Sequence, residues 1–126
     1  MKQAIHPSGA PKPMGPYSPA VAIEGLLFCS GQGPMDPDTG RIIEGGIAEQ
    51  TEQTLRNLGT LLEGAGLGYA DVVKTSCFLR DMDDFTAFNE VYARFFPEPY
   101  PARTTVQAAR LPGDIGVEIE AIAVRR

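Results

Sequence analysis

The sequence has few of the residues on which many kinds of active site depend. Its 126 residues include one histidine, two cysteines and no tryptophan. A His/Cys zinc site and a disulfide framework are therefore excluded, and a histidine-centred triad would have to use His6. The 11 basic residues are outnumbered by 16 acidic ones, for a net charge of −5, which argues against non-specific binding of nucleic acid.

Long apolar runs are also missing. A membrane helix needs about 18 or more consecutive apolar residues, which occur nowhere in the chain, and the first residues lack the pattern of a secretory signal peptide. Two cysteines without a close partner are typical of a reducing compartment. We therefore expect a cytoplasmic protein that makes no membrane contact, and the length suits one domain over residues 1–126.

Apolar periodicity predicts strands and helices in a definite order. Apolar residues recur at spacings of three and four over residues 48–65, which predicts a helix, and Asp81 is placed to cap a second helix. The apolar face of that second helix carries four aromatic residues that we expect in the core: Phe85, Phe88, Tyr92 and Phe95. The expected strands are 3–5, 18–23, 26–30, 71–80, 103–111 and 116–124. This order, β-ββ-α-β-α-ββ, predicts a two-layer α+β fold with both helices on one face of a mixed sheet.

Two glycine-rich stretches resemble ligand-binding loops. Residues 64–68 (Gly-Ala-Gly-Leu-Gly) close a helix instead of opening one, so a helix C-cap is favoured over a phosphate loop. Residues 30–33 (Ser-Gly-Gln-Gly) follow an apolar strand but precede no helix, so a nucleophile elbow is disfavoured. A simple turn and a close approach of a ligand to this backbone both remain open. Cys29, inside the apolar run, is expected to be a buried and unreactive thiol.

The last two strands carry the most informative polar residues. A tight turn at 112–115 would pair Ala109 with Glu118 and place Arg103, Thr105 and Glu118 on one face of a hairpin. This face is either an ordinary solvated surface or a cleft in which Arg103 grips a carboxylate and Glu118 carries a proton. In this register Arg103 and Glu118 lie roughly 20 Å apart. A shared small ligand would then need Arg103 from one subunit and Glu118 from another.

Six short motifs run through the chain in a fixed order. They are Gly15-Pro16-Tyr17-Ser18-Pro19-Ala20, Cys29-Ser30-Gly31-Gln32, Val73-Lys74-Thr75, Asn89-Glu90-Val91-Tyr92, Pro101-Ala102-Arg103 and Val117-Glu118-Ile119-Glu120-Ala121. Together they resemble the RidA (YjgF, L-PSP) family of enamine/imine deaminases over essentially the whole chain. The resemblance implies a chorismate-mutase-like α+β domain and a homotrimer with a central barrel and clefts between subunits.

The resemblance also implies an activity that needs no metal or cofactor. The family hydrolyses 2-iminobutanoate, 2-iminopropanoate and related tautomers of enamines such as 2-aminoacrylate to 2-keto acids and ammonia. Carried over by motif, Arg103 binds the substrate carboxylate, Glu118 activates or positions water, and the Gly31 backbone contacts the substrate nitrogen or nearby polar groups. The residues that shape and polarise the pocket are Tyr17, Ser30 and Asn89.

One position departs from the family pattern. Thr105 stands where many deaminating members have cysteine, so a hydrogen-bonding hydroxyl replaces a thiol and thiol-based chemistry there is in doubt. Glu118, flanked by Val117 and Ile119, is expected to have a raised pKa in a partly desolvated cleft. Alternatives are a deaminase for another enamine such as aminomuconate and a non-catalytic, small-molecule-binding or chaperone-like trimer. A ribonuclease activity is disfavoured by the net charge.

Overall fold

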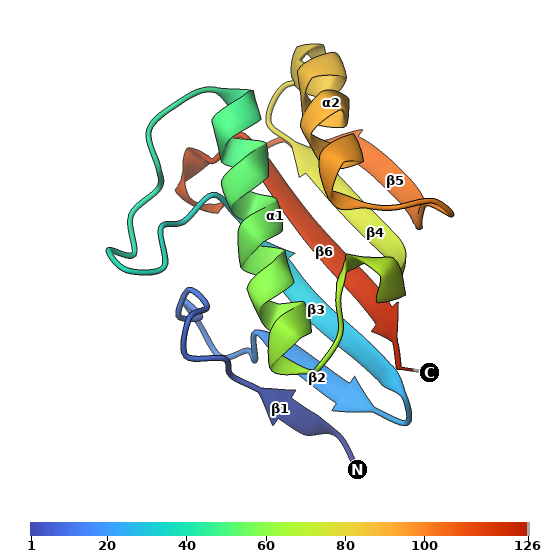
Figure 1. Cartoon of the computed structure of the whole chain (residues 1–126). Helices are drawn as coiled ribbons and strands as arrows, with labels where there is room; N and C mark the ends of the chain where they lie inside the picture. Colours follow the sequence, from blue (N-terminus) through green and yellow to red (C-terminus); the bar gives the residue numbers. More distant parts are fainter. Residues whose placement is uncertain (126) are drawn as a thin grey trace.

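A computed structural model, which describes residues 1–125, shows a mixed sheet with two α-helices on one face (Figure 1). The strands are β1 (Gln3–Ile5), β2 (Ala20–Ile23), β3 (Leu26–Gln32), β4 (Val72–Leu79), β5 (Ala102–Gln107) and β6 (Val117–Val124). The helices are α1 (Ile47–Gly64) and α2 (Phe85–Phe95). The predicted α+β class, the order of the elements and the placement of both helices on one face are confirmed.

The pairing of the last two strands differs from the prediction. The sheet order is β1-β2-β3-β6-β4-β5, so β4 lies between β5 and β6 and the expected hairpin does not form. Thr75, in β4, pairs with Arg103 on one side and with Ala121 on the other. The reason is the α2 crossover, which returns the chain beside β4 as a parallel neighbour. Residues 108–116 then form a longer connection, with Leu111 and Ile115 buried, in place of a tight turn.

The helix α1 packs on β3 and β6 and against α2. Its core-facing leucines are completely buried: Leu55, Leu58, Leu61 and Leu62. At its N-terminus the Glu49 carboxylate accepts a hydrogen bond from the Gly46 amide at 2.8 Å. At its C-terminus Gly66 adopts a φ of 76°, and the Leu67 amide donates to the Leu62 carbonyl at 2.8 Å. The interpretation of the glycine-rich stretch as a helix C-cap is confirmed.

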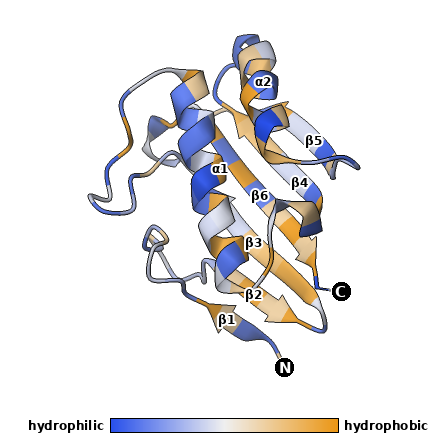
Figure 2. Cartoon of the chain, viewed as in Figure 1, coloured by the Kyte–Doolittle hydropathy of each residue, from blue (hydrophilic) through white to orange (hydrophobic). Residues whose placement is uncertain are grey.

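Hydrophobic residues concentrate on the strands and on the inward side of the helices (Figure 2). Along β6 the buried residues alternate with more exposed ones, so the two faces of the sheet differ in burial. The buried residues are Val117, Ile119, Ala121 and Ala123. The helices therefore cover one face of the sheet, and the other face is open. Within residues 1–125, neither helix is both long and apolar enough to cross a membrane.

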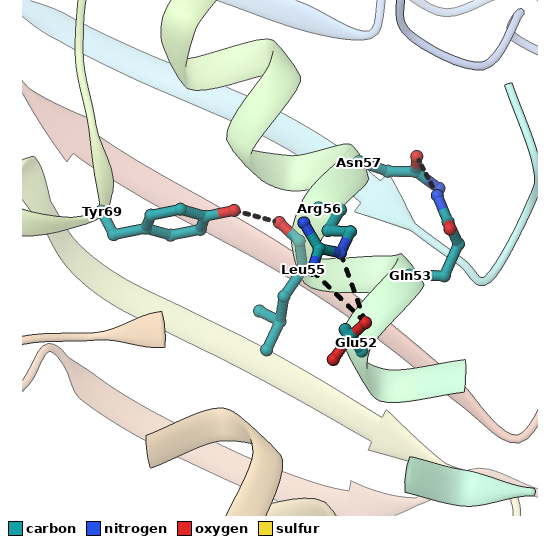
Figure 3. A network of polar contacts seen from close by, with 6 residues as sticks. All are labelled: Glu52, Gln53, Leu55, Arg56, Asn57 and Tyr69. Carbon is teal, nitrogen blue, oxygen red and sulfur yellow. Dashed lines mark hydrogen bonds and ion pairs between the residues drawn. The ribbon is translucent and has the colours of Figure 1, made fainter. Parts of the chain in front are cut away.

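The buried side-chain amide of Asn57, on α1, forms hydrogen bonds with the segment that follows β3. The Nδ2 of Asn57, 2% exposed, donates to the carbonyl oxygens of Gly33 at 2.9 Å and Met35 at 2.8 Å. Its Oδ1 accepts from Gln53 Nε2 at 3.0 Å. Figure 3 shows this amide pair on α1 near the contact of Tyr69 with the Leu55 carbonyl. Helical periodicity alone did not reveal the role of Asn57, because its partners lie in a distant loop.

We predict that Asn57→Asp destabilises the protein by about 2–3 kcal/mol. The substitution keeps the shape of the side chain, but a carboxylate cannot donate to the two carbonyl groups that Asn57 holds. Urea unfolding measures the change. Arg56→Lys is the control on the same helix, because its exposed ion pair with Glu52 contributes little. Equal stability of Asn57→Asp and the control would contradict the prediction.

Candidate functional site

Arg103 lies on the helix-covered face of the edge strand β5, under α2. Its guanidinium carbon is 4.7 Å from the ring centre of Tyr92, 5.3 Å from that of Phe88 and 5.6 Å from that of Phe85. These distances are those of cation–π contacts. Phe88 and Tyr92 are buried, as expected for core residues, but Phe85 is 37% exposed, so its assignment to the core is corrected. The aromatic stripe of α2 thus packs on the core and also faces a cation.

The charge of Arg103 is not neutralised by any of the residues that the structure describes. Within residues 1–125, no carboxylate forms an ion pair with this half-buried guanidinium, and it donates no hydrogen bond. Two polar atoms close by in the fold are buried without a hydrogen bond of normal geometry: Asn89 Oδ1, on the same stripe of α2, and Thr105 Oγ1, two residues along β5. As far as the structure describes the chain, the β5–α2 edge therefore has a cation without an ion pair and side-chain oxygens with hydrogen-bonding capacity to spare, which suits a small polar anion.

Glu118 lies on the open face of the sheet, against Gly31. A Cβ atom built on Gly31 would come within 2.6 Å of Glu118 Oε2, so any side chain at position 31 would collide with the carboxylate. Ser30, beside it, donates from its hydroxyl to the Ser18 carbonyl at 2.7 Å and ties β3 to the segment before β2. The close packing of Glu118 on β3 therefore requires a glycine at position 31. The sequence pattern did not reveal this contact.

The pKa of Glu118 is raised, first by burial and second by the negative charge of Glu120. Both carboxylates lie on the open face, two residues apart on β6, so the charge of Glu120 disfavours ionisation of Glu118. The expectation of a raised pKa agrees with this direction. A half-buried carboxyl group whose pKa is raised accepts a proton more readily than an ordinary glutamate does, as a proton carrier must.

Arg103 and Glu118 point to opposite faces of the sheet. Arg103 shares its row with Thr75 and Ala121, whereas Glu118 shares its row with Phe78. Ala121 and Glu118 are three residues apart on one strand and so face opposite sides. The prediction that Arg103 and Glu118 share a face is wrong, because β4 separates their strands. Two strand spacings and three residues place their Cα atoms roughly 14 Å apart, closer than the hairpin register predicted.

The predicted site residues form two groups in the chain. Arg103, Asn89 and Thr105 gather at β5 and α2, and Glu118, Gly31 and Ser30 gather at β3 and β6. Tyr17, half exposed, lies in the segment that Ser30 anchors, and its hydroxyl accepts from the Met14 amide at 3.1 Å. The chain alone does not bring the two groups together.

The cysteines and the histidine show no arrangement typical of a nucleophile or a metal site. Burial raises the pKa of the Cys29 thiol to about 12 and that of Cys77 to about 11, so both are protonated at neutral pH. The expected inert thiol at Cys29 is confirmed. His6 is exposed. In the described part of the chain, no three His, Cys, Asp or Glu side chains are grouped so that they could hold a metal ion.

Comparison with known proteins shows strong similarity over the whole fold. The sequence profile of the family described as "Endoribonuclease L-PSP" matches residues 7–125. A RutC family protein of Pyrococcus horikoshii is 50% identical, with 99% of each chain covered. The human protein named 2-iminobutanoate/2-iminopropanoate deaminase is 41% identical, covering 99% of this chain and 91% of its own. The structure of Escherichia coli TdcF with bound serine is 42% identical with a TM-score of 0.93, covering 98% of this chain and 99% of its own.

We predict that the Glu118 carboxyl group titrates above the ordinary glutamate value of about 4.3, because both its burial and Glu120 disfavour its charged form. Carboxyl-carbon NMR follows the titration directly. Glu120→Gln removes the neighbouring charge and should move the midpoint to lower pH, whereas Glu90→Gln, an exposed change on α2, should leave it in place. An ordinary midpoint, or one unmoved by Glu120→Gln, would show that these causes do not act.

Proposed function

Since its match to the Endoribonuclease L-PSP profile spans residues 7–125, this chain belongs to that family, and on this premise we propose that it is a 2-iminobutanoate/2-iminopropanoate deaminase. The overall reaction adds water to a 2-imino acid and gives a 2-keto acid and ammonia. The human relative is named for this activity. The related TdcF structure holds serine, which carries a carboxylate and an amine on one carbon as the tetrahedral intermediate of this reaction does.

The observation that carries the proposal is the unneutralised charge of Arg103. A half-buried guanidinium without a carboxylate partner among residues 1–125 is matched by a ligand that brings a carboxylate. The planar guanidinium binds such a group through two parallel hydrogen bonds and fixes its orientation. The imino carbon next to that carboxylate is then held in a defined place.

The second group of residues supports a site formed between subunits of a homotrimer. Glu118 is on the open face, where large apolar side chains are left exposed: Leu26 by 37%, Phe28 by 42% and Val106 by 43%. Apolar residues gathered on one face are typical of a surface that another copy covers. In the proposed trimer the open faces line a central barrel, and Glu118 of one subunit meets Arg103 of the next.

In this site the chemistry proceeds by acid–base steps. Arg103 holds the substrate carboxylate. Glu118 takes a proton from a water molecule while the oxygen of that water bonds to the imino carbon, and the electron pair of the C=N bond moves to nitrogen. Glu118 then returns this proton to nitrogen, which gives an intermediate with a hydroxyl and an amino group on one carbon. In the second step the hydroxyl proton is carried by Glu118 to the amino nitrogen, the carbonyl forms as the C–N bond breaks, and ammonia leaves. Carbon and nitrogen neither gain nor lose electrons to a partner, so the reaction as balanced calls for no redox cofactor.

The other predicted residues complete the pocket in this proposal. The Gly31 backbone contacts the substrate nitrogen beside Glu118, and Thr105 offers its hydroxyl near Arg103. Asn89 offers its free amide oxygen from α2. Tyr17 and Ser30 shape the side of the pocket next to Glu118. The protein is expected to act in the cytoplasm, without nucleic acid or membrane partners.

A non-catalytic trimer that binds small amino or keto acids is the second candidate, since the bound serine of TdcF is compatible with binding alone. A binding module would depend on Arg103 but would not need a proton carrier at Glu118. A deaminase for another enamine, such as aminomuconate, would use the same two residues, and a substrate panel separates these activities.

Arg103→Ala is predicted to lower kcat/KM for ammonia release by about 100-fold or more, because the substrate carboxylate loses its charged partner. The substrate is generated in the assay by a pyridoxal-phosphate dehydratase acting on serine or threonine, and ammonia is measured by a coupled reaction. Arg110→Ala, which removes an exposed arginine with a weak ion pair, is the matched control and should keep full activity. Full turnover by Arg103→Ala would refute the proposed role.

Glu118→Gln is predicted to lower kcat by about 100- to 10,000-fold with little change in the binding of a 2-keto acid, because the amide cannot accept a proton. Glu24→Gln, in the exposed turn between β2 and β3, is the control. Loss of turnover with retained binding supports the deaminase. Absence of turnover in the unmodified protein, with binding that depends on Arg103, would favour the non-catalytic module instead.

A further inference from the structure

The guanidinium of Arg103 is surrounded on one side by aromatic rings of α2. Tyr92 is the nearest, at 4.7 Å, with Phe88 and Phe85 within 6 Å. The Tyr92 ring is itself packed between Phe88, at 5.6 Å between ring centres, and Phe96, at 4.5 Å. Tyr92 is 6% exposed. The surface on which Arg103 rests is therefore built from packed side chains that have little freedom to move.

Tyr92 is also tied to the strand next to Arg103. Its hydroxyl and the Thr75 hydroxyl form a buried hydrogen bond of 2.7 Å. Thr75 is the residue of β4 that pairs with Arg103 of β5. The tyrosine thus contacts the arginine with its ring and the neighbour of the arginine with its hydroxyl, which fixes the ring relative to the backbone that carries Arg103.

We propose that Tyr92, assisted by Phe88 and Phe85, is a positioning residue that holds the Arg103 guanidinium in one orientation for a ligand carboxylate; this rests on the proposed function. A free arginine samples many rotamers, and ordering it when the ligand binds weakens binding. Contact with the rings orders the guanidinium beforehand. In this proposal the rings of α2 contact a face of the planar group, and its edge N–H groups remain for the two oxygens of a carboxylate.

This arrangement implies that position 103 requires arginine. A lysine ammonium at position 103 would keep the charge but would present no flat face to Tyr92 and no pair of parallel donors to a carboxylate. The aromatic stripe of α2 therefore has a second role beside packing in the core. It makes the arginine selective for ligands that end in a carboxylate.

The test combines a spectroscopic signature with binding. In the ligand-free protein, ring currents should shift the side-chain NMR signals of Arg103 upfield. Tyr92→Leu should remove most of this shift and weaken binding of 2-oxobutanoate, the keto acid product, by about tenfold. In the deaminase assay KM should rise by about the same factor, with kcat changed by less than about threefold. Tyr92→Phe keeps the ring and should retain the shift, with affinity within about threefold of the unmodified protein.

A matched control separates positioning from loss of packing. Phe95→Leu removes a ring from the same helix, but Phe95 faces Tyr69, at 5.5 Å between ring centres, instead of Arg103. It should leave the Arg103 signals and the affinity unchanged while lowering Tm. If Tyr92→Leu does not fold, Phe85→Leu removes a 37% exposed ring from the same contact and should give a smaller change in the same direction.

Two results would overturn the proposal. The first is a folded Tyr92→Leu protein, or Phe85→Leu in its place, with unchanged Arg103 signals and unchanged affinity. The second is equal weakening by Phe95→Leu, which would assign the effect to the packing of α2 as a whole. The NMR signature does not depend on turnover. An unmodified protein that releases no ammonia would therefore refute the proposed function while the Arg103 signals still decide whether Tyr92 holds the guanidinium.

Discussion

The position of β4 between β5 and β6 is the constraint on which the site depends. The α2 crossover makes β4 and β5 parallel neighbours, and β6 takes the other edge of β4. Arg103 and Glu118 are consequently separated by a strand and turned to opposite faces of the sheet. The residue proposed to bind an anion and the residue proposed to transfer a proton are thus kept apart in one chain. Within one chain the two side chains form no ion pair with each other, so each stays available to a ligand or to a second subunit.

Each half of the site is built from its own surroundings. Arg103 is supported by rings from α2, so its position is set by the packing of the helix on the sheet. Glu118 is supported by the backbone of Gly31, where the absence of a side chain lets the carboxylate pack closely on β3. Burial and Glu120 raise the pKa of Glu118, which favours proton exchange. The proposed trimer joins a cation from one subunit to a carboxyl group from another, and both lie on regular strands and not on loops.

Much of the fold could be predicted from the sequence, because apolar spacing reports directly on which side of a helix or strand is buried. The leucines of α1 and the glycine C-cap after it are examples. The prediction of strand pairing failed for residues 103–124. Two alternating segments joined by Pro112-Gly113-Asp114 are equally compatible with a hairpin and with two strands that have another strand between them. The alternation of apolar and polar residues within a strand does not show which other strand lies beside it, so it could not predict that β4 lies between β5 and β6. The contacts of Asn57 and Tyr92 were missed for a related reason: helical spacing identifies a buried face but not the distant groups that it meets.

The central claim is that a working site combines Arg103 of one subunit with Glu118 of another. Mixing Arg103→Ala and Glu118→Gln chains in equal amounts, unfolding them and refolding them together measures this directly. If subunits combine at random and each site uses one residue from each of two neighbours, one site in four is intact, and the mixture should recover about a quarter of normal ammonia release. Refolding either variant alone should recover none. A mixture that stays as inactive as its separate components would contradict the account, because each chain would then have to supply both residues to its own site.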